Sequence, residues 1–119
     1  MIPQVYFYFD SNNIYNQLIK NQKEFFECAD KGSEFVCFVN VLNIEDLKSF
    51  IKYLKEEINL NMGEIRELTS EIWDGYGFDE LEPHFGEETS EKIIDESWAY
   101  LCDLFPKEYD EWRKNLLRK

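Results

Sequence analysis

The sequence predicts an α/β or α+β fold, with one domain over residues 1–119, a small sheet and four to five helices. Two short runs of β-branched and aromatic residues, near residues 4–9 and 34–40, predict at least two buried strands. Elsewhere, apolar residues recur every three or four positions, which is the spacing of amphipathic helices. The length of 119 residues suits one compact domain and is short for two.

The first half of the chain is expected to alternate between strand and helix. Val5–Phe9 is the first predicted strand, and Asp10–Asn13 follows it with residues that form turns and cap helices. The apolar pattern then predicts a helix from Ile14 to about Ala29, and Phe35–Val39 is the second predicted strand. If the two strands pair in parallel through this helix, the crossover should be right-handed.

The second half of the chain is expected to be helical. Asn43 is placed to cap a helix that runs from Ile44 to Ile58, the most regular amphipathic pattern in the sequence. A short helix around Leu68 is expected next, and a glycine-containing loop over Asp74–Phe78 follows it.

Two further helices are expected to close the domain. The first begins near Ser90, and Pro106 starts the second, because proline is tolerated in the first turn of a helix. The predicted inner faces are formed by Ile94, Trp98, Leu101 and Phe105 in the first helix, and by Tyr109, Trp112, Leu116 and Leu117 in the second.

Charge is the most unusual property of the composition. The chain has 25 acidic and 13 basic residues, which gives a formal net charge of −12. Residues 1–55 carry a net charge of −1, residues 56–111 carry −15, and residues 112–119 carry +4. Such a field disfavours DNA, RNA and anionic membranes as direct partners, because phosphate binding needs lysine and arginine. It favours a basic protein as the partner.

The excess charge is concentrated in residues 73–96, which also hold large aromatic side chains and which we call the acidic segment. Clustered carboxylates repel one another, and a cationic partner would relieve that repulsion. Carboxylates guide association, and aromatic side chains supply the desolvated anchors of an interface. The predicted partner-binding residues are Trp73, Asp74, Tyr76, Asp79, Glu80, Glu82, Glu87, Glu88, Glu91, Asp95 and Glu96. A solvated acidic face over an aromatic core is the alternative interpretation.

The residue pattern predicts no catalytic residue, no metal site and no cofactor. Cys28, Cys37 and Cys102 are far apart in the sequence and His84 is the only histidine, so zinc ligands at short spacing are missing. The cysteines are therefore expected to be buried free thiols in a reducing compartment. We find no secretory signal pattern and no apolar run long enough to cross a membrane. These features predict a cytoplasmic protein that is not an enzyme.

One short motif favours a different interpretation. The strand Val5–Phe9, followed by Asp10 and Asn13, resembles the first motif of PIN-like NYN ribonucleases. The resemblance implies that Asp10 and Asn13 help to hold a divalent metal ion, in a concave cluster with other carboxylates. Alternatively, Asp10 or Asn13 only caps the helix that follows. A metal-dependent PIN-like nuclease is therefore one alternative function.

In size, acidity and aromatic content, the whole chain resembles the bacterial immunity proteins of colicin and contact-dependent growth inhibition systems. Such proteins neutralise a basic toxin, often a nuclease, by covering its active site or a nearby surface. The resemblance implies a one-to-one complex in which carboxylates of the acidic segment replace phosphates at the toxin's active site. A DNA mimic, such as an antirestriction or anti-CRISPR inhibitor, is the other alternative. Evenly spaced surface carboxylates would favour mimicry, and one compact patch would favour immunity.

Overall fold

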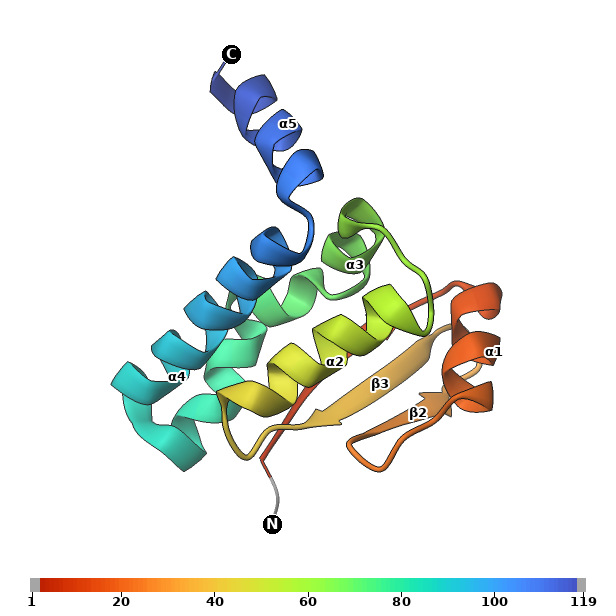
Figure 1. The fold of residues 1–119 in the computed structure, drawn as a ribbon. Coiled ribbons are helices and arrows are strands. Elements are labelled where there is room, and N and C mark those ends of the chain that lie inside the picture. The colour runs from red at the N-terminus through yellow and green to blue at the C-terminus, as the bar shows by residue number, and fades with distance from the viewer. Residues whose placement is uncertain (1–2, 118–119) are drawn as a thin grey trace.

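Three antiparallel strands form the sheet of the computed structural model, which describes residues 3–117 (Figure 1). The strands are β1 (Gln4–Phe9), β2 (Phe26–Asp30) and β3 (Phe35–Asn40), and β3 lies between the other two. In the register, Phe7 of β1 and Cys28 of β2 both lie opposite Cys37 of β3. The two predicted strands are present, but the parallel pairing considered from the sequence does not occur. The fold is therefore of the α+β class.

The first helix is shorter than predicted. α1 (Asn12–Lys20) begins after Ser11, whose hydroxyl oxygen accepts a hydrogen bond from the backbone N–H of Ile14 at 3.2 Å. Asn21 ends the helix, and its side-chain amide donates to the carbonyl oxygen of Gln17. Ser11 is therefore the cap of α1, rather than Asp10 or Asn13, which the sequence had suggested.

The last part of the predicted first helix forms strand β2 instead. Phe26 and Cys28 are buried and alternate with the exposed Glu27, which is the period of a strand with one face in the core. The predicted helix to Ala29 is wrong here because pairing with β3 outweighs the local helical pattern.

The next two helices agree with the sequence. α2 (Ile44–Glu56) begins with a capping box. The Asn43 side chain accepts a hydrogen bond from the backbone N–H of Asp46, and the Asp46 carboxylate accepts one from the backbone N–H of Asn43. α3 (Met62–Leu68) begins with a second capping box, formed by Asn61 and Glu64. Both caps satisfy N–H groups that would otherwise lack partners at the helix starts.

The segment after α3 is more helical than predicted. A π-helical turn, η1 (Ile72–Tyr76), occupies most of the predicted loop and continues into the long helix α4 (Gly77–Leu104). The helix predicted from near Ser90 corresponds to the part of α4 that follows the non-helical backbone at Gly86, whereas the helical turns before Gly86 were not predicted. The glycines act as bends within this helical path: Gly75 has φ 105°, and Gly86 has φ 81° and ψ 169°. Only glycine adopts these angles without strain.

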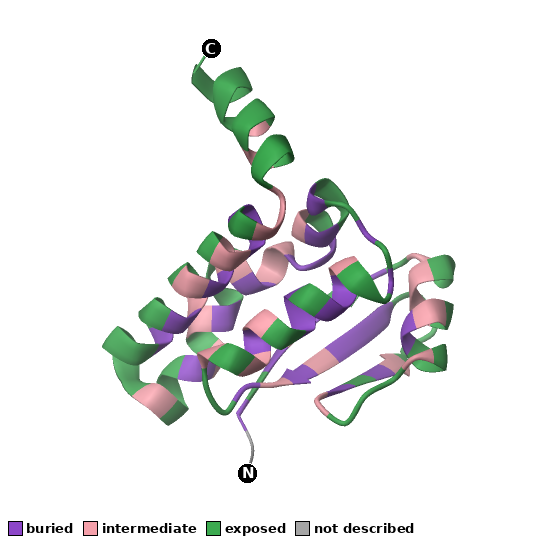
Figure 2. Ribbon diagram, viewed as in Figure 1, coloured by how far each residue is buried: buried purple, intermediate pink, exposed green. Residues whose placement is uncertain are grey.

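The last helix begins where predicted but has a different environment. α5 (Pro106–Leu117) projects from the body of the molecule and buries none of its residues (Figures 1 and 2). Tyr109 and Trp112 are half-buried, whereas Leu116 and Leu117 are 50% and 79% exposed. The predicted inner stripe is therefore wrong for the two leucines. No helix within residues 3–117 is long and apolar enough to cross a lipid bilayer.

The two faces of the sheet have different environments. One face packs under the helices and joins a single core that includes Phe7, Cys37 and Phe50, and α2 lies across this face in Figure 1. The alternate side chains of the strands point to the other face, where Tyr8 is 40% exposed. We call this second face the open sheet face. It consists of Gln4, Tyr6, Tyr8, Glu27, Ala29, Val36, Phe38 and Asn40.

Candidate functional site

The acidic segment folds as η1 and the first two thirds of α4, and non-helical backbone at Gly75 and Gly86 interrupts this helical path. Most of its carboxylates are exposed, namely Asp74, Asp79, Glu82, Glu87, Glu88, Glu91 and Asp95. Among the described residues, the one ion pair within the segment joins Lys92 and Glu96, with 4.0 Å between Nζ and Oε1. The segment therefore keeps an excess of negative charge that this protein's own cations do not neutralise.

Nine of the eleven predicted residues fall into three groups, and the first surrounds a groove near α5. Trp73, Asp74 and Asp95 line it together with Arg66, Ser70, Ile94 and Trp98, and its volume is about 500 Å³. The indole N–H of Trp73 donates to Ser97 Oγ at 3.0 Å, and the ring packs edge-on against Trp98. Trp73 is therefore held in place by its own protein and is only half exposed to a partner.

The second group lies along the outer edge of β1. The Glu80 carboxylate accepts a hydrogen bond from the backbone N–H of Tyr6 at 3.0 Å, and the Glu71 carboxylate accepts one from Tyr8 at 3.3 Å. Burial raises the pKa of Glu80 to about 7, although the hydrogen bond from Tyr6 opposes this shift. The nearby Glu80 charge is in turn the largest cause of a raised pKa at the Tyr6 phenol, and Tyr76 also contributes. Tyr76 is 62% exposed beside this edge.

The third group lies around the bend in α4. Glu82, Glu87, Glu88 and Glu91 are exposed there, and Gly86 between them has non-helical backbone angles. After the bend, Glu87, Glu91 and Asp95 follow one another at intervals of four residues. They form a row along one side of the helix, about 6 Å apart along its axis.

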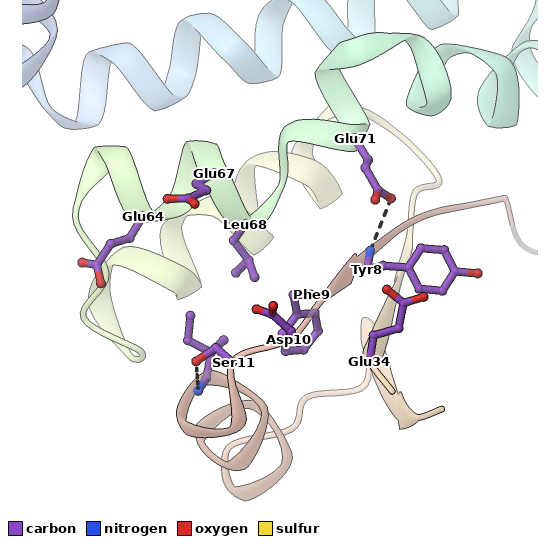
Figure 3. A pocket seen from close by; sticks show the side chains of 10 residues that line it. Tyr8, Phe9, Asp10, Ser11, Glu34, Glu64, Glu67, Leu68 and Glu71 are labelled. Atoms are coloured by element: carbon purple, nitrogen blue, oxygen red, sulfur yellow. Dashed lines mark hydrogen bonds between the residues drawn. The ribbon is translucent and has the colours of Figure 1, made fainter. Parts of the chain in front are cut away.

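The structure also contains an acidic pocket that lies outside the acidic segment (Figure 3). Its volume is about 500 Å³, and Asp10 contributes to its wall at the end of β1. The other carboxylates come from Glu34, Glu64, Glu67 and Glu71. These residues are far apart in the sequence and meet because α3 packs near the end of β1. The motif at Asp10 indicated a carboxylate cluster, and the acidic spacing of Glu64, Glu67 and Glu71 is the signal in the sequence that could have indicated its other members.

This pocket bears on the nuclease interpretation. Asp10 does lie in a concave cluster with other carboxylates, as that interpretation requires. However, between residues 3 and 117 no three histidine, cysteine, aspartate or glutamate side chains are close enough together to hold a metal ion. His84 is exposed on α4, and the three cysteines are buried and free, as the sequence predicted. The geometry suits several separate cationic groups better than one metal ion.

The chain matches no protein-family model, and no curated protein or solved structure is significantly similar to it. The function must therefore be argued from the geometry and charge of these surfaces.

Proposed function

We propose that this protein is an immunity protein that binds a basic toxin, such as a nuclease domain, in a one-to-one complex and neutralises it. The observation that carries the proposal is the excess of exposed, uncompensated carboxylates along η1 and α4. Under this proposal the protein acts as a stoichiometric inhibitor and catalyses no reaction.

Electrostatics supports a cationic partner for this surface. Seven exposed carboxylates lie along η1 and α4, and their mutual repulsion destabilises the folded chain. A partner rich in lysine and arginine would remove that cost and would be attracted over long distances, which speeds association. A nuclease has such a surface because it binds phosphates.

The aromatic side chains near these carboxylates supply the second requirement of a tight complex. Electrostatic attraction alone gives fast but short-lived binding, whereas buried aromatic anchors slow dissociation. Tyr76, at 62% exposure, is the most exposed aromatic side chain of the acidic segment. It belongs to η1, which packs against β1, and it contributes to the raised pKa of the Tyr6 phenol.

Co-expression with the product of the adjacent gene tests this proposal. Cells that express that product alone should stop growing, and cells that also express this chain should grow. The two proteins should co-purify as a one-to-one complex, measured by size-exclusion chromatography with light scattering. If the chain neither restores growth nor forms this complex, the proposal fails for that pair.

A matched pair of variants tests the part played by the acidic segment. Glu88→Lys/Glu91→Lys reverses two exposed carboxylates on α4, and Glu24→Lys/Glu56→Lys makes the same charge change on exposed residues far from it in the sequence. The first variant should lose protection and weaken the complex by roughly a hundredfold, as expected for two interfacial charge pairs. The second should behave as the wild type. Equal effects from both variants would mean that only net charge matters.

A DNA mimic that inhibits a restriction or CRISPR effector is the second candidate, and one observation favours it. The row of Glu87, Glu91 and Asp95 has regular spacing on one side of α4. Regular spacing of negative charge is the property that a mimic of a phosphate backbone needs. Under this hypothesis the chain displaces duplex DNA from a purified restriction enzyme, and Glu91→Gln weakens the displacement. An immunity protein would leave such an enzyme bound to its DNA.

A further inference from the structure

The open sheet face is a surface with aromatic side chains that does not belong to the core. The Tyr6 ring centroid lies 5.8 Å from that of Tyr8 and 5.7 Å from that of Phe38, so the three rings form one continuous strip across β1 and β3. None of the three rings belongs to the main hydrophobic cluster or packs against it, and Val36, which lies opposite Tyr8 on the same face, is outside this cluster although it is completely buried. Sheets with one side open to water usually carry polar residues there.

Three aromatic rings elsewhere in the molecule have a lysine or arginine of the same chain over them, whereas within residues 3–117 the rings of this strip have none. On the helical side of the molecule, Lys48 lies over Tyr100, Lys55 over Phe105 and Arg66 over Trp112, with 5.1–5.7 Å to each ring centroid. Among the described residues, no lysine or arginine lies over a ring of the open sheet face. The negative faces of these rings are therefore free to accept an external cation.

Carboxylates surround the strip on several sides. Glu27 of β2 lies opposite Phe38 in the register and is exposed on the same face. Glu34 lies beside Tyr8 in Figure 3, at the rim of the acidic pocket. Glu71 and Glu80 hold the edge of β1 through their hydrogen bonds. A guanidinium group on the rings would thus find a carboxylate at the edge of the strip.

We propose that the basic partner docks on the open sheet face and places arginine side chains on the Tyr6, Tyr8 and Phe38 rings, with their guanidinium groups directed to the surrounding carboxylates. This inference rests on the proposed function, and it identifies the aromatic rings that hold the partner in the complex. Arginine fits better than lysine because its planar guanidinium stacks on aromatic rings and pairs with carboxylates at the same time. Tyr76 and Glu80 connect this face to the acidic segment, so one partner can cover both.

A second copy of this chain fits the face poorly. Each copy carries a formal net charge of −12, and pairing two open sheet faces would bring their surrounding carboxylates together. Strand addition at β1 is also blocked, because the carboxylates of Glu80 and Glu71 already occupy the outward N–H groups of Tyr6 and Tyr8. The charge and the geometry therefore favour a cationic protein that lies on the face.

The probe for this proposal is a nona-arginine peptide, titrated into the full-length ¹⁵N-labelled protein at low salt and followed by NMR. The largest shifts should occur at Tyr6, Tyr8 and Phe38, with smaller shifts around Tyr76 and Glu80. Nona-lysine carries the same charge and should bind several times more weakly. Shifts confined to residues 82–96, or equal affinity for both peptides, would overturn the proposal. A dimer in sedimentation equilibrium that hides the open sheet face would overturn it as well.

Variants separate this proposal from the broader one. Tyr6→Leu/Tyr8→Leu keeps the strip apolar but removes two ring faces, and it should weaken nona-arginine binding roughly fivefold to thirtyfold. Tyr100→Leu removes a ring that already has Lys48 over it, and binding should stay unchanged. Circular dichroism melts show whether each variant is folded, and Tyr6→Phe/Tyr8→Phe, which keeps the rings, should bind like the wild type.

The same variants in the co-expression assay distinguish the two possible failures. If the one-to-one complex forms and Tyr6→Leu/Tyr8→Leu binds as tightly as the wild type, the docking site is wrong and the proposed function stands. If nona-arginine binds the open sheet face but the chain protects no cells, the face is a cation site and the immunity proposal fails.

Discussion

The Glu80 carboxylate accepts a hydrogen bond from the backbone N–H of Tyr6, 74 residues earlier in the chain, at 3.0 Å. This contact joins the acidic segment to the edge of the sheet. It leaves a half-buried carboxylate near the half-buried Tyr6 phenol, and it blocks part of an edge strand that would otherwise be open to pairing with another chain. One residue of the predicted binding surface therefore also protects the fold.

The raised pKa of Glu80 predicts a pH dependence of stability. Below about pH 4.5 the side chain is protonated in both the folded and the unfolded chain, so it has no effect on their balance. As the pH rises from 4.5 to about 7, the unfolded chain loses this proton first, which favours unfolding. Relative to Glu80→Gln, the wild type should therefore lose stability across this range in urea melts. Parallel stability curves for the two proteins would contradict the assignment.

The junction of η1 and α4 depends on a glycine. A Cβ atom on Gly77 would overlap the backbone carbonyl oxygen of Ile72 and lie 3.0 Å from Cδ1 of Ile94. Gly77→Ala should therefore lower the free energy of unfolding by about 1–3 kcal/mol, as overpacking does. Gly63→Ala is the matched control, because a Cβ there meets only Asn61 Oδ1 at 3.5 Å inside α3. That control should be neutral or stabilising by about 0.5–1 kcal/mol in the same melts.

The three cysteines should be unreactive in the folded protein. Cys28 and Cys37 face each other across β2 and β3, and a hydrogen bond to Cys28 together with burial raises the pKa of Cys37. Burial also raises the pKa of Cys102. A thiol-labelling reagent should react with all three only at the rate of unfolding. Ser33→Cys, in the exposed turn before β3, should react at once, and equally fast labelling of the native thiols would contradict the structure.

The end of α5 should be dispensable for folding. A chain that ends at Glu111 loses the contacts of Trp112 with Trp98 and Arg66, worth about 1–2 kcal/mol in all. It should still unfold in one cooperative transition. Leu116→Ser/Leu117→Ser should change stability by less than about 0.5 kcal/mol, because both side chains are exposed. A molten or non-cooperative truncated chain would show that α5 is part of the core.

Local chemistry was enough to predict much of the fold. The strand positions of β1 and β3 followed from β-branched and aromatic runs, and the start of α2 followed from the cap at Asn43. Strand β2 could not be predicted in the same way. Its alternation of buried and exposed residues is only five residues long, and it directly follows the apolar pattern from Ile14 that fits a helix. The loop predicted at Asp74–Phe78 and the helix predicted from near Ser90 correspond to breaks at Gly75 and Gly86, but the helical turns between these two breaks were not predicted.

The candidate site was harder to predict than the fold. The acidic segment was visible in composition, but nine of its eleven predicted residues separate into a groove, a strand edge and a bend in α4. The open sheet face and the acidic pocket depend on contacts between residues that are distant in sequence, such as Tyr8 and Glu71, 63 positions apart. Only the alternation of Tyr6 and Tyr8 with buried neighbours in β1 indicated a second, aromatic face.

Under the proposed function, this protein's carboxylates attract a basic protein. Stopped-flow measurement of the association rate between the chain and the toxin from the co-expression assay, at rising salt, tests this attraction. The rate should fall at least tenfold between low and physiological salt, and Glu88→Lys/Glu91→Lys should flatten this dependence. A rate that is independent of salt and unchanged by those substitutions would contradict it.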